Sequence, residues 1–480
     1  MLWFLFSCAV KVAPLPDPLI EIEPFRQNVD WEEVESEATV LLQEYLRVDT
    51  INPPGNELQG ALFLEKVLEK EGIETEIHES EPGRGNLVAR IPAAPELKSD
   101  EKALCLLSHI DVVTHNEENW PKDKHPMSGV LDDDGIIWGR GALDMKGMGI
   151  MELMTMLLIK RMNIPLHRDV IMIAVADEEV GGTGMQFMVN TYWDFLNCGQ
   201  MINEGGLGLK DMMFEGQSVY PISVGEKGNV WLKMWAYGEA GHGSTPRPNE
   251  APQKLLEAIL KLQNRPIEAE LYDELQQLFV LVGDNKGGVY RNIMANPMLF
   301  NLLVKPKLME NPLTRAALIN TVHLTGFAGE NMPNVVPAEV YAVLDCRILP
   351  GVDPQEFIED LQGLVGPEIH FEVLHARAGN ASPIDDPLYS ALARYAVEDE
   401  PNSVAGPVIS VGFTDSIYAR PLGTHAYGFV PILVTENEME GFHGKNERIS
   451  KEQLGRGVYK LYSAVVEVSA VQQNDEESNK

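Results

Sequence analysis

The stretch ALCLLSHIDVV (residues 103–113) decides the fold class, together with the residues that follow it. It is a continuous apolar run that ends in a histidine and an aspartate. A second run of this kind, DVIMIAVADEEVGG, occupies residues 169–182, and GMGIMELMTMLLIKRMNI (147–164) between them has the length of a buried helix. Apolar strands that alternate with helices are typical of a largely parallel sheet covered by helices. The sequence therefore predicts an α/β fold.

The flanking sequence extends this pattern and then interrupts it. Apolar residues recur at helical spacing in residues 31–48 and 57–73, and again from about 451 to 468. After about Gly225 apolar and polar residues alternate instead, in three stretches: NVWLKMWAYGEAGHGSTP (229–246), NVVPAEVYAVLDCRIL (334–349) and EIHFEVLHARAG (368–379). A period of two predicts an antiparallel sheet with one open face and helices on the other.

These changes of pattern predict an α/β domain that is interrupted by an inserted α+β domain. The segment from about 265 to 325 is longer than such an insertion needs, so it should add extra helices. The predicted parts are an apolar N-terminus with a Pro-rich tether (1–29), the first part of the α/β domain (30–226), the insertion (227–377), the second part of the α/β domain (378–470) and an acidic disordered tail (471–480).

Charge excludes two classes of partner. The chain has 480 residues with a formal net charge of −34 and no long basic run, which argues against binding to nucleic acid or to an anionic membrane. The apolar start MLWFLFSCAV is too short to span a bilayer, but Leu-Phe-Ser-Cys8 loosely resembles a lipoprotein cleavage box. The compartment stays open between the cytoplasm and the cell envelope.

The cysteines predict neither a metal site nor a disulfide framework. There are four, and Cys105 and Cys346 lie in apolar runs with the character of buried strands. The spacing fits no Cys-type zinc site. We therefore expect inert, buried thiols.

Five clusters of histidine and acidic residues follow apolar runs or lie in adjoining loops: SHIDVV (108–113), GRGALDMKG (139–147), ADEEVGG (176–182), NEGG (203–206) and GFHG (441–444). Alone, each also fits an ion pair, a helix cap or a solvated charge run. The strand ends of an open α/β sheet form a binding crevice. The three consecutive acids of ADEEVGG would repel one another there unless a cation binds. Imidazole and carboxylate together are the ligand set of zinc-type ions. One carboxylate would bridge two ions, and another would remain free to act on water.

The motifs SHIDVV, GRGALDMKG, ADEEVGG, NEGG, GHGSTP and GFHG resemble those of the di-zinc aminoacylase/carboxypeptidase family. That family includes aminoacylases, glutamate carboxypeptidase, succinyl-diaminopimelate desuccinylase and acetylornithine deacetylase. The resemblance covers residues from about 35 to 465, with the motifs in the family's order. The segment ENMPNVVPAEVYAVLDCRILPG (330–351) is most similar to the branch of carboxypeptidase S and the N-fatty-acyl-amino-acid hydrolases.

The resemblance implies a role for each candidate residue. Asp144 would bridge two metal ions, with a cis peptide bond after it. The other ligands would be His109 and Glu204 for one ion, and Glu179 and His443 for the other. Glu178 would be the general base, and Asp111 the helper behind His109. His242 would stabilise the oxyanion, and the substrate carboxylate would be held by Asn334, Arg347 and Thr414.

The implied reaction is hydrolysis of the amide bond of an N-acyl amino acid, or of a C-terminal peptide bond, by a metal-bridging hydroxide that Glu178 activates. The ions would be zinc, with cobalt or manganese as alternatives. The insertion would be a lid and dimerisation domain whose His242 serves the partner subunit, although a monomer stays open. Two other functions also stay open: a di-zinc aminopeptidase or dipeptidase, and a relative that has lost catalysis.

Overall fold

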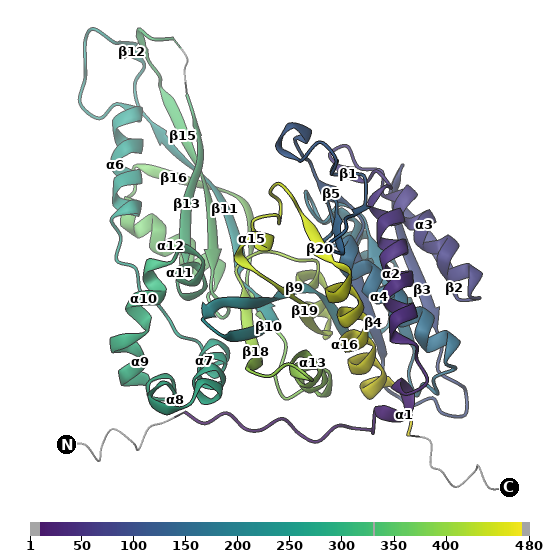
Figure 1. Cartoon of the computed structure of the whole chain (residues 1–480). Helices are drawn as coiled ribbons and strands as arrows, with labels where there is room; N and C mark the ends of the chain where they lie inside the picture. The colour runs from purple at the N-terminus through teal and green to yellow at the C-terminus, as the bar shows by residue number, and fades with distance from the viewer. Residues whose placement is uncertain (1–9, 330–331, 473–480) are drawn as a thin grey trace, which may run out of the picture.

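The computed structural model describes residues 10–329 and 332–472. Cys8 and residues 473–480 lie outside these described residues. The predictions of a lipoprotein box and of a disordered acidic tail fall on them. Figure 1 shows two lobes, one built on a nine-stranded sheet and one on a four-stranded sheet. Within the described ranges, no helix combines the length and the apolar character needed to cross a bilayer.

The larger lobe confirms the α/β class. Its sheet has the order β17-β10-β19-β9-β4-β8-β3-β2, with β18 beside β10. The strands are β2 (Glu74–Glu81), β3 (Arg84–Ile91), β4 (Ala103–His109), β8 (Val170–Val175), β9 (Cys198–Phe214), β10 (Gln217–Glu226), β17 (Asn380–Ala381), β18 (Ser403–Ser410) and β19 (His425–Val434). The central strands β19, β9, β4 and β8 run parallel, whereas β3 and β2 are antiparallel at one edge. We call this lobe the catalytic lobe, after the role that the resemblance implies for it.

Helices cover both faces of this sheet because its central strands are apolar on both sides. Along β4, Leu104 and Leu106 pack into the larger core, and Leu107 packs into the core of the opposite face. The larger core is closed by α2 (Trp31–Leu46), α3 (Glu57–Lys70), α4 (Lys146–Arg161), α13 (Pro387–Val397) and α16 (Lys451–Ser469), and the opposite core by α5 (Thr183–Leu196). Both faces are therefore buried, and the polar ends of the strands are where a site can form.

A disulfide bond joins Cys105 and Cys198, so the prediction of inert thiols at these positions is wrong. Cys105 lies on β4 and Cys198 begins β9, and these two strands are parallel neighbours in the sheet. The two side chains share one buried core, and their Cα atoms are 5.8 Å apart, within the usual range for a disulfide. Cys346 is free and buried, as predicted.

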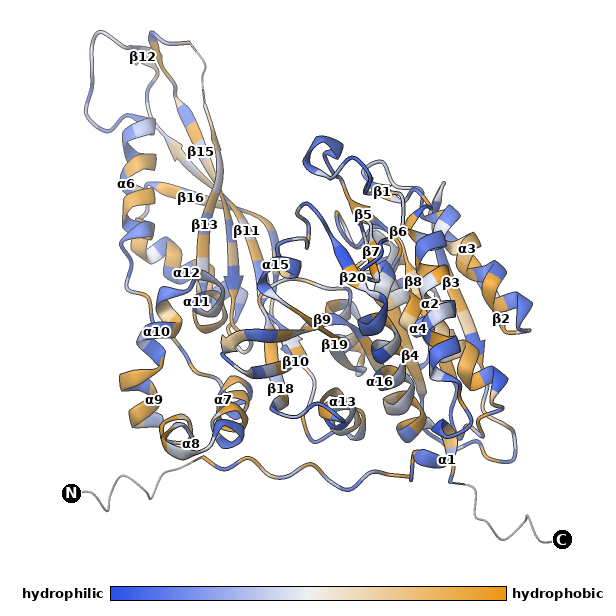
Figure 2. Cartoon of the chain, in the orientation of Figure 1, coloured by the Kyte–Doolittle hydropathy of each residue, from blue (hydrophilic) through white to orange (hydrophobic). Residues whose placement is uncertain are grey.

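The smaller lobe is an antiparallel sheet with helices on one side only. Its order is β13-β15-β11-β16, formed by β11 (Gly228–Tyr237), β13 (Thr321–Ala328), β15 (Glu339–Ile348) and β16 (Ile369–Arg377). Every second residue of β11 and β15 packs under α6 (Ala251–Gln263) and α12 (Pro354–Val365). Hydrophobic and hydrophilic residues alternate along α6 in Figure 2, as expected of a helix that covers a sheet. We call this lobe the lid.

The extra helices of the long segment contribute to a core that they share with the catalytic lobe, and the last of them also lines a cavity with β13 of the lid. They are α7 (Asp273–Lys286), α8 (Gly288–Ala295), α9 (Pro297–Leu303), α10 (Lys305–Glu310) and α11 (Pro312–Leu318). Leu278 and Phe279 of α7 share a core with Val219 of β10 and Val404 of β18. The predicted range 227–377 therefore contains both the lid sheet and a helical part that extends the catalytic lobe.

The Pro-rich N-terminal segment runs along the outside of the catalytic lobe. In Figure 1 it passes from α8 to α1 (Glu23–Arg26), beneath the other helices. The Val10 amide donates a hydrogen bond to the Ala295 carbonyl at one end, and Arg394 of α13 donates to the Pro16 carbonyl further along. This segment thus connects the helical part of the molecule with α13 and α16.

Candidate metal centre

The site begins where β4 ends, at His109. The ring of His109 donates through Nδ1 to the carbonyl oxygen of Asp111 at 2.9 Å, which leaves the Nε2 lone pair free to bind an ion. The carboxylate of Asp111 lies 3.5 Å from the same Nδ1. It also accepts hydrogen bonds from Asn52 at 2.8 Å and from the backbone amides of Glu178 and Glu179 at 3.1 and 3.2 Å. Asp111 therefore orients both the histidine and the acidic loop after β8.

Asp144 lies in the turn before α4, and a buried glutamate that the sequence analysis missed shapes this turn. Glu447 accepts hydrogen bonds from the backbone amides of Gly141, Leu143 and Asp144 at 2.9, 2.7 and 3.0 Å, and Arg140 donates to it at 2.6 Å. Because Glu447 follows His443 by four residues, it joins the loops of two predicted ligands. The peptide bond between Asp144 and Met145 is cis, as the resemblance implies.

Glu204 approaches the site from β9, next to two glycines. Gly206 passes so close to its neighbours that a Cβ atom there would lie 2.3 Å from the Gly428 carbonyl oxygen of β19. Only glycine allows the strands to approach this closely. The NEGG motif therefore combines a candidate ligand with the backbone that brings it to the sheet edge.

The structure brings all five predicted ligands together in two groups that share Asp144. In the first group, His109 Nε2 lies 3.1 Å from Asp144 Oδ1 and 3.8 Å from Glu204 Oε1. In the second, His443 Nε2 lies 2.7 Å from Asp144 Oδ2 and 3.1 Å from Glu179 Oε2. The two oxygens of one carboxylate thus face two different histidines, as a bridging ligand requires.

The charge of the cluster fits a bound cation. Burial raises the pKa of Glu204 well above its usual value, and the neighbouring Asp144 raises it further. Hydrogen bonds to Asp144 and Glu179 raise the pKa of His443 to about 10. Glu179 Oε1 is buried and has no hydrogen-bond partner. A group of acids that repel one another, with a buried free oxygen and two imidazoles, matches the donor set of a zinc-type site.

Glu178 differs from its neighbour Glu179, because its side chain belongs to neither ligand group. Its backbone amide is held by Asp111, which fixes its position at the end of β8. Burial raises the pKa of Glu178 well above the usual range, and the nearby Glu204 adds to this effect. A free carboxylate with a raised pKa beside a cation site is suited to move a proton.

The structure places His242 and Asn334 far from this cluster in the same chain. His242 lies in β12 (Gly241–His242), which pairs with β14 (Val335–Val336), and the Gly243 amide donates to the Asn334 carbonyl at 2.8 Å. Figure 1 shows this pair of short strands at the outer tip of the lid. Both residues are exposed there.

Arg347 and Thr414 lie nearer the junction of the lobes, but each already has a partner. Arg347 donates two hydrogen bonds to Asp345 on its own strand, at 2.8 and 3.0 Å. The Thr414 hydroxyl and amide donate to Glu226 at 2.5 and 3.2 Å. The sequence analysis missed Arg377, whose guanidinium lies 4.5 Å from the ring centroid of Tyr418. Only its place on β16, next to β11 in the sheet, brings it to this junction.

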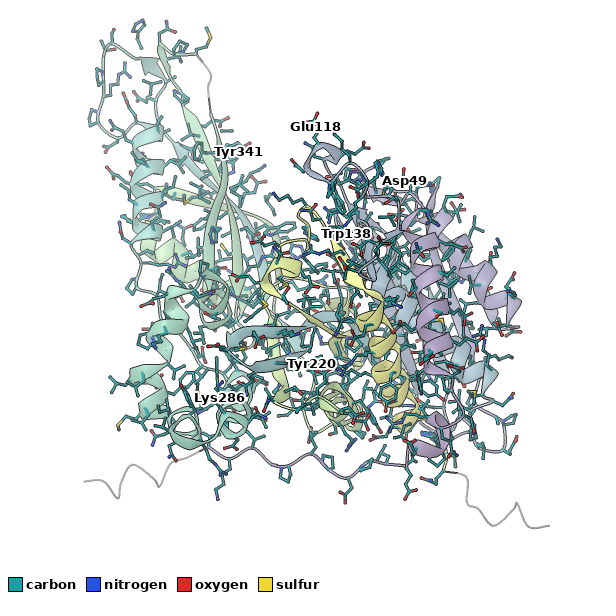
Figure 3. All side chains as sticks on the ribbon, in the orientation of Figure 1. Asp49, Glu118, Trp138, Tyr220, Lys286 and Tyr341 are labelled. Atoms are coloured by element: carbon teal, nitrogen blue, oxygen red, sulfur yellow. A yellow bond between two sulfur atoms is a disulfide. The ribbon has the colours of Figure 1, made fainter. Side chains whose placement is uncertain are left out.

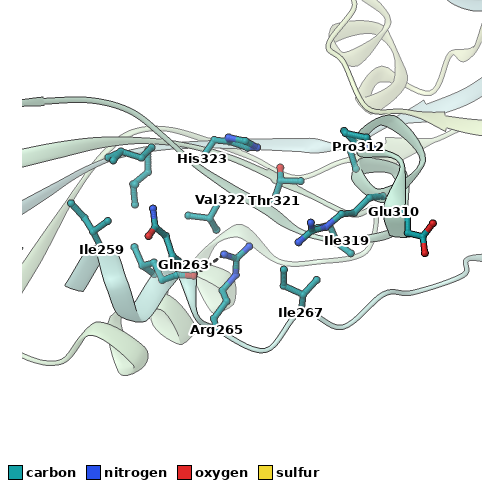
Figure 4. A pocket seen from close by; sticks show the side chains of 15 residues that line it. Ile259, Gln263, Arg265, Ile267, Glu310, Pro312, Ile319, Thr321, Val322 and His323 are labelled. Atoms are coloured by element: carbon teal, nitrogen blue, oxygen red, sulfur yellow. Dashed lines mark hydrogen bonds between the residues drawn. The ribbon is translucent and has the colours of Figure 1, made fainter. Parts of the chain in front are cut away.

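A cavity of about 620 Å³ lies elsewhere, between the end of α6, α11 and β13 (Figure 4). Its lining includes Arg265, Gln263 and His323, and it contains no predicted ligand or substrate-binding residue. The volume of a cavity alone does not identify a functional site. The cluster around Asp144 is the site because its donors converge.

A profile of peptidase family M20/M25/M40 matches residues 105–467, and the chain belongs to this family. It is 33% identical over 361 residues to the N-fatty-acyl-amino acid synthase/hydrolase PM20D1 of Homo sapiens, a match that covers 72% of this chain and 70% of that protein. It is 28% identical over 450 residues to Aminoacylase-1A of Rattus norvegicus, covering 92% of this chain and 98% of that protein. The chain is therefore an enzyme of the metallohydrolase class.

The fold is shared with solved structures of low sequence identity. A metallo-carboxypeptidase of the M20 family from Sulfolobus solfataricus aligns with a TM-score of 0.66 at 20% identity, covering 90% of this chain and 99% of that chain. The dipeptidase Dug1p from Saccharomyces cerevisiae aligns with a TM-score of 0.65 at 14% identity, covering 93% and 98%. These alignments support the two-lobed fold.

Proposed function

We propose that this enzyme hydrolyses the amide bond of N-acyl amino acids, or C-terminal peptide bonds, in substrates with a free carboxylate. Three relatives support this substrate class through their names: an N-fatty-acyl-amino acid synthase/hydrolase, a probable carboxypeptidase S-like protein and an aminoacylase. The single observation that carries the proposal is the pair of ligand groups that share Asp144.

His109, Glu204, Glu179 and His443 would hold two divalent ions on either side of Asp144. Zinc fits the mixture of imidazole and carboxylate donors best, and cobalt or manganese fit the same donors. When bound, such ions lower the pKa of water and polarise a carbonyl oxygen.

The protein's own residues then direct the proton. Glu178 takes a proton from the attacking water and passes it to the nitrogen of the leaving amino acid, because its carboxylate is free of the ligand groups. Asp111 keeps the proton of His109 on Nδ1 and holds the amides of the Glu178–Glu179 loop. Its role is to position two groups, which is the usual task of a carboxylate behind a ligating histidine.

Recognition of the substrate carboxylate falls to Arg347, assisted by Asn334 and Thr414. A guanidinium binds a carboxylate through two parallel hydrogen bonds, so a substrate would replace Asp345 at Arg347. Thr414 would first have to be released from Glu226, or else act by shaping the junction.

His242 would stabilise the oxyanion in the site of a partner subunit. Its place at the tip of the lid, away from its own cluster, supports delivery between the two chains of a two-fold dimer. In the same dimer Asn334 would also reach the partner's site, because Asn334 and His242 lie beside each other on paired segments.

The test is a hydrolysis screen of the zinc-loaded protein with three substrate sets: N-acyl amino acids, the same compounds with the carboxylate converted to an amide, and dipeptides with a free amine. We expect turnover of the first set and its loss in the second. Preference for the free-amine dipeptides would favour an aminopeptidase or dipeptidase instead. Bound metal without any turnover would indicate a relative that has lost catalysis.

A further inference from the structure

Among the described residues, no helix packs on one face of the lid sheet, and this face carries an ordered set of side chains. On β11 and β15 the residues that alternate with the buried core positions lie on it. Figure 1 shows α6 and α12 on one side of the sheet and the catalytic lobe on the other side. Tyr341, which shares this open face, is labelled on the lid in Figure 3.

The row of the open face nearest the junction is cationic. Asn229 of β11 pairs with Arg347 on one side and with Arg377 on the other. Glu226, three residues before Asn229, accepts hydrogen bonds from Thr414 and from Arg420 in the catalytic lobe. This row is therefore continuous with the place where the proposed function puts the substrate carboxylate.

The next row begins with an exposed indole. Trp231 pairs with Asp345 and His375, and its side chain is 41% exposed. The ring centroids of Trp231 and His375 are 5.5 Å apart, and His375 donates to Asn229 at 3.1 Å. Burial lowers the pKa of His375, and Arg377 and Arg347 lower it further.

Resting on the proposed function, we propose that Trp231 binds the side chain of the substrate's amino acid and that this side chain is large and apolar. Trp231 lies opposite Asp345, which is two residues from Arg347 on β15. The two rows are about 7 Å apart along the strands, and neighbouring strands are about 5 Å apart. A large side chain of an amino acid whose carboxylate is held at Arg347 can span this diagonal. The exposed indole offers a wide apolar surface at this position.

The charges in the row of Trp231 disfavour an acidic side chain on the substrate's amino acid. Asp345 lies beside Trp231 across the strand pair, and it becomes an unpaired carboxylate once a substrate takes Arg347. A like charge this close disfavours an aspartate or glutamate side chain. The acyl group extends from the other side of the scissile bond, away from the carboxylate, so it is not the part that meets this row.

The experiment compares kcat/KM for N-acylphenylalanine, N-acylalanine and N-acylaspartate, all with the acyl group (acetyl or lauroyl) that the zinc-loaded wild type turns over faster. We expect the wild type to prefer phenylalanine over alanine by about tenfold or more, and aspartate to be the poorest. Trp231→Ala should reduce the phenylalanine preference by about tenfold, mainly through KM, whereas Trp231→Phe should restore most of it. Tyr237→Ala is the matched control, because Tyr237 has similar exposure (48%) further along β11.

Three results are decisive. A lower preference in Trp231→Ala but not in Tyr237→Ala supports the inference. Hydrolysis of all three substrates without a preference, or an unchanged ratio in Trp231→Ala, overturns it and leaves the proposed function intact. If the metal-loaded wild type hydrolyses no N-acyl amino acid, the proposed function fails and the inference fails with it.

Discussion

The two lobes contribute to the site in different ways. In the catalytic lobe all five candidate ligands converge within one chain: His109 ends β4, Glu204 lies on β9, and the other three lie in turns and loops. In the lid, the predicted substrate-binding residues are spread from the junction at Arg347 to the outer tip at His242. The candidate metal ligands are thus assembled within one lobe, whereas His242 at the tip of the lid would need a movement of the lid, or a second chain, to reach a metal site.

The largest effect should come from the catalytic lobe, at Glu178. Glu178→Ala should lower kcat by about 10²–10⁴-fold, which is the usual contribution of a general base. Metal content, measured by elemental analysis, should stay near that of the wild type, whereas Glu179→Ala should lose metal. Activity near the wild-type level in Glu178→Ala would remove this residue from the proton path.

A smaller effect on kcat is expected in the lid, at His242, which should act in the site of the partner chain. His242→Ala should lower kcat by roughly 10²–10³-fold, the usual loss of an oxyanion donor, and His370→Ala serves as a lid histidine control. Mixing His242→Ala protein with Glu178→Ala protein should restore activity after subunit exchange, because one site of each mixed pair regains both groups. Confirmed exchange without recovered activity would show that His242 does not act in the partner's site.

A milder effect, on metal affinity, is expected at Glu447, which holds the turn that carries Asp144. Glu447→Gln should weaken metal affinity by about 10–100-fold, because an amide cannot accept all the hydrogen bonds that Glu447 accepts around Asp144. The exposed Glu440→Gln in the same loop is the control. Equal affinity in both variants, measured by competition with a chelator, would mean that Glu447 does not position Asp144.

The smallest effect on catalysis should come from the disulfide. Cys105→Ser should lower the free energy of unfolding by about 2–4 kcal/mol, since the bond closes a long loop. Denaturant titration measures this loss, and peptide mapping without reductant should recover the linked Cys105 and Cys198 peptides. Free thiols at both positions in the oxidised protein would contradict the bond.

The sequence predicted the features that depend on local spacing and missed those that depend on strand order. The candidate ligands lie in motifs that resemble those of a known family, so their residue types could be recognised from the sequence alone. Cys198 could not be paired with Cys105, because only the order of the sheet makes β9 the neighbour of β4. Glu447 has no pattern of its own, and its role arises from a turn 300 residues earlier in the chain. Extra helices were predicted between about 265 and 325, but the packing of α7 on β18 depends on tertiary contacts.

The proposed function requires Asp144 to bridge two ions in the catalytic lobe, and anomalous diffraction from crystals of the zinc-loaded protein can locate these ions. We predict two peaks roughly 3.5–4 Å apart, one beside His109 and Glu204 and the other beside Glu179 and His443. A single peak, or peaks away from Asp144, would show that Asp144 is not a bridging ligand.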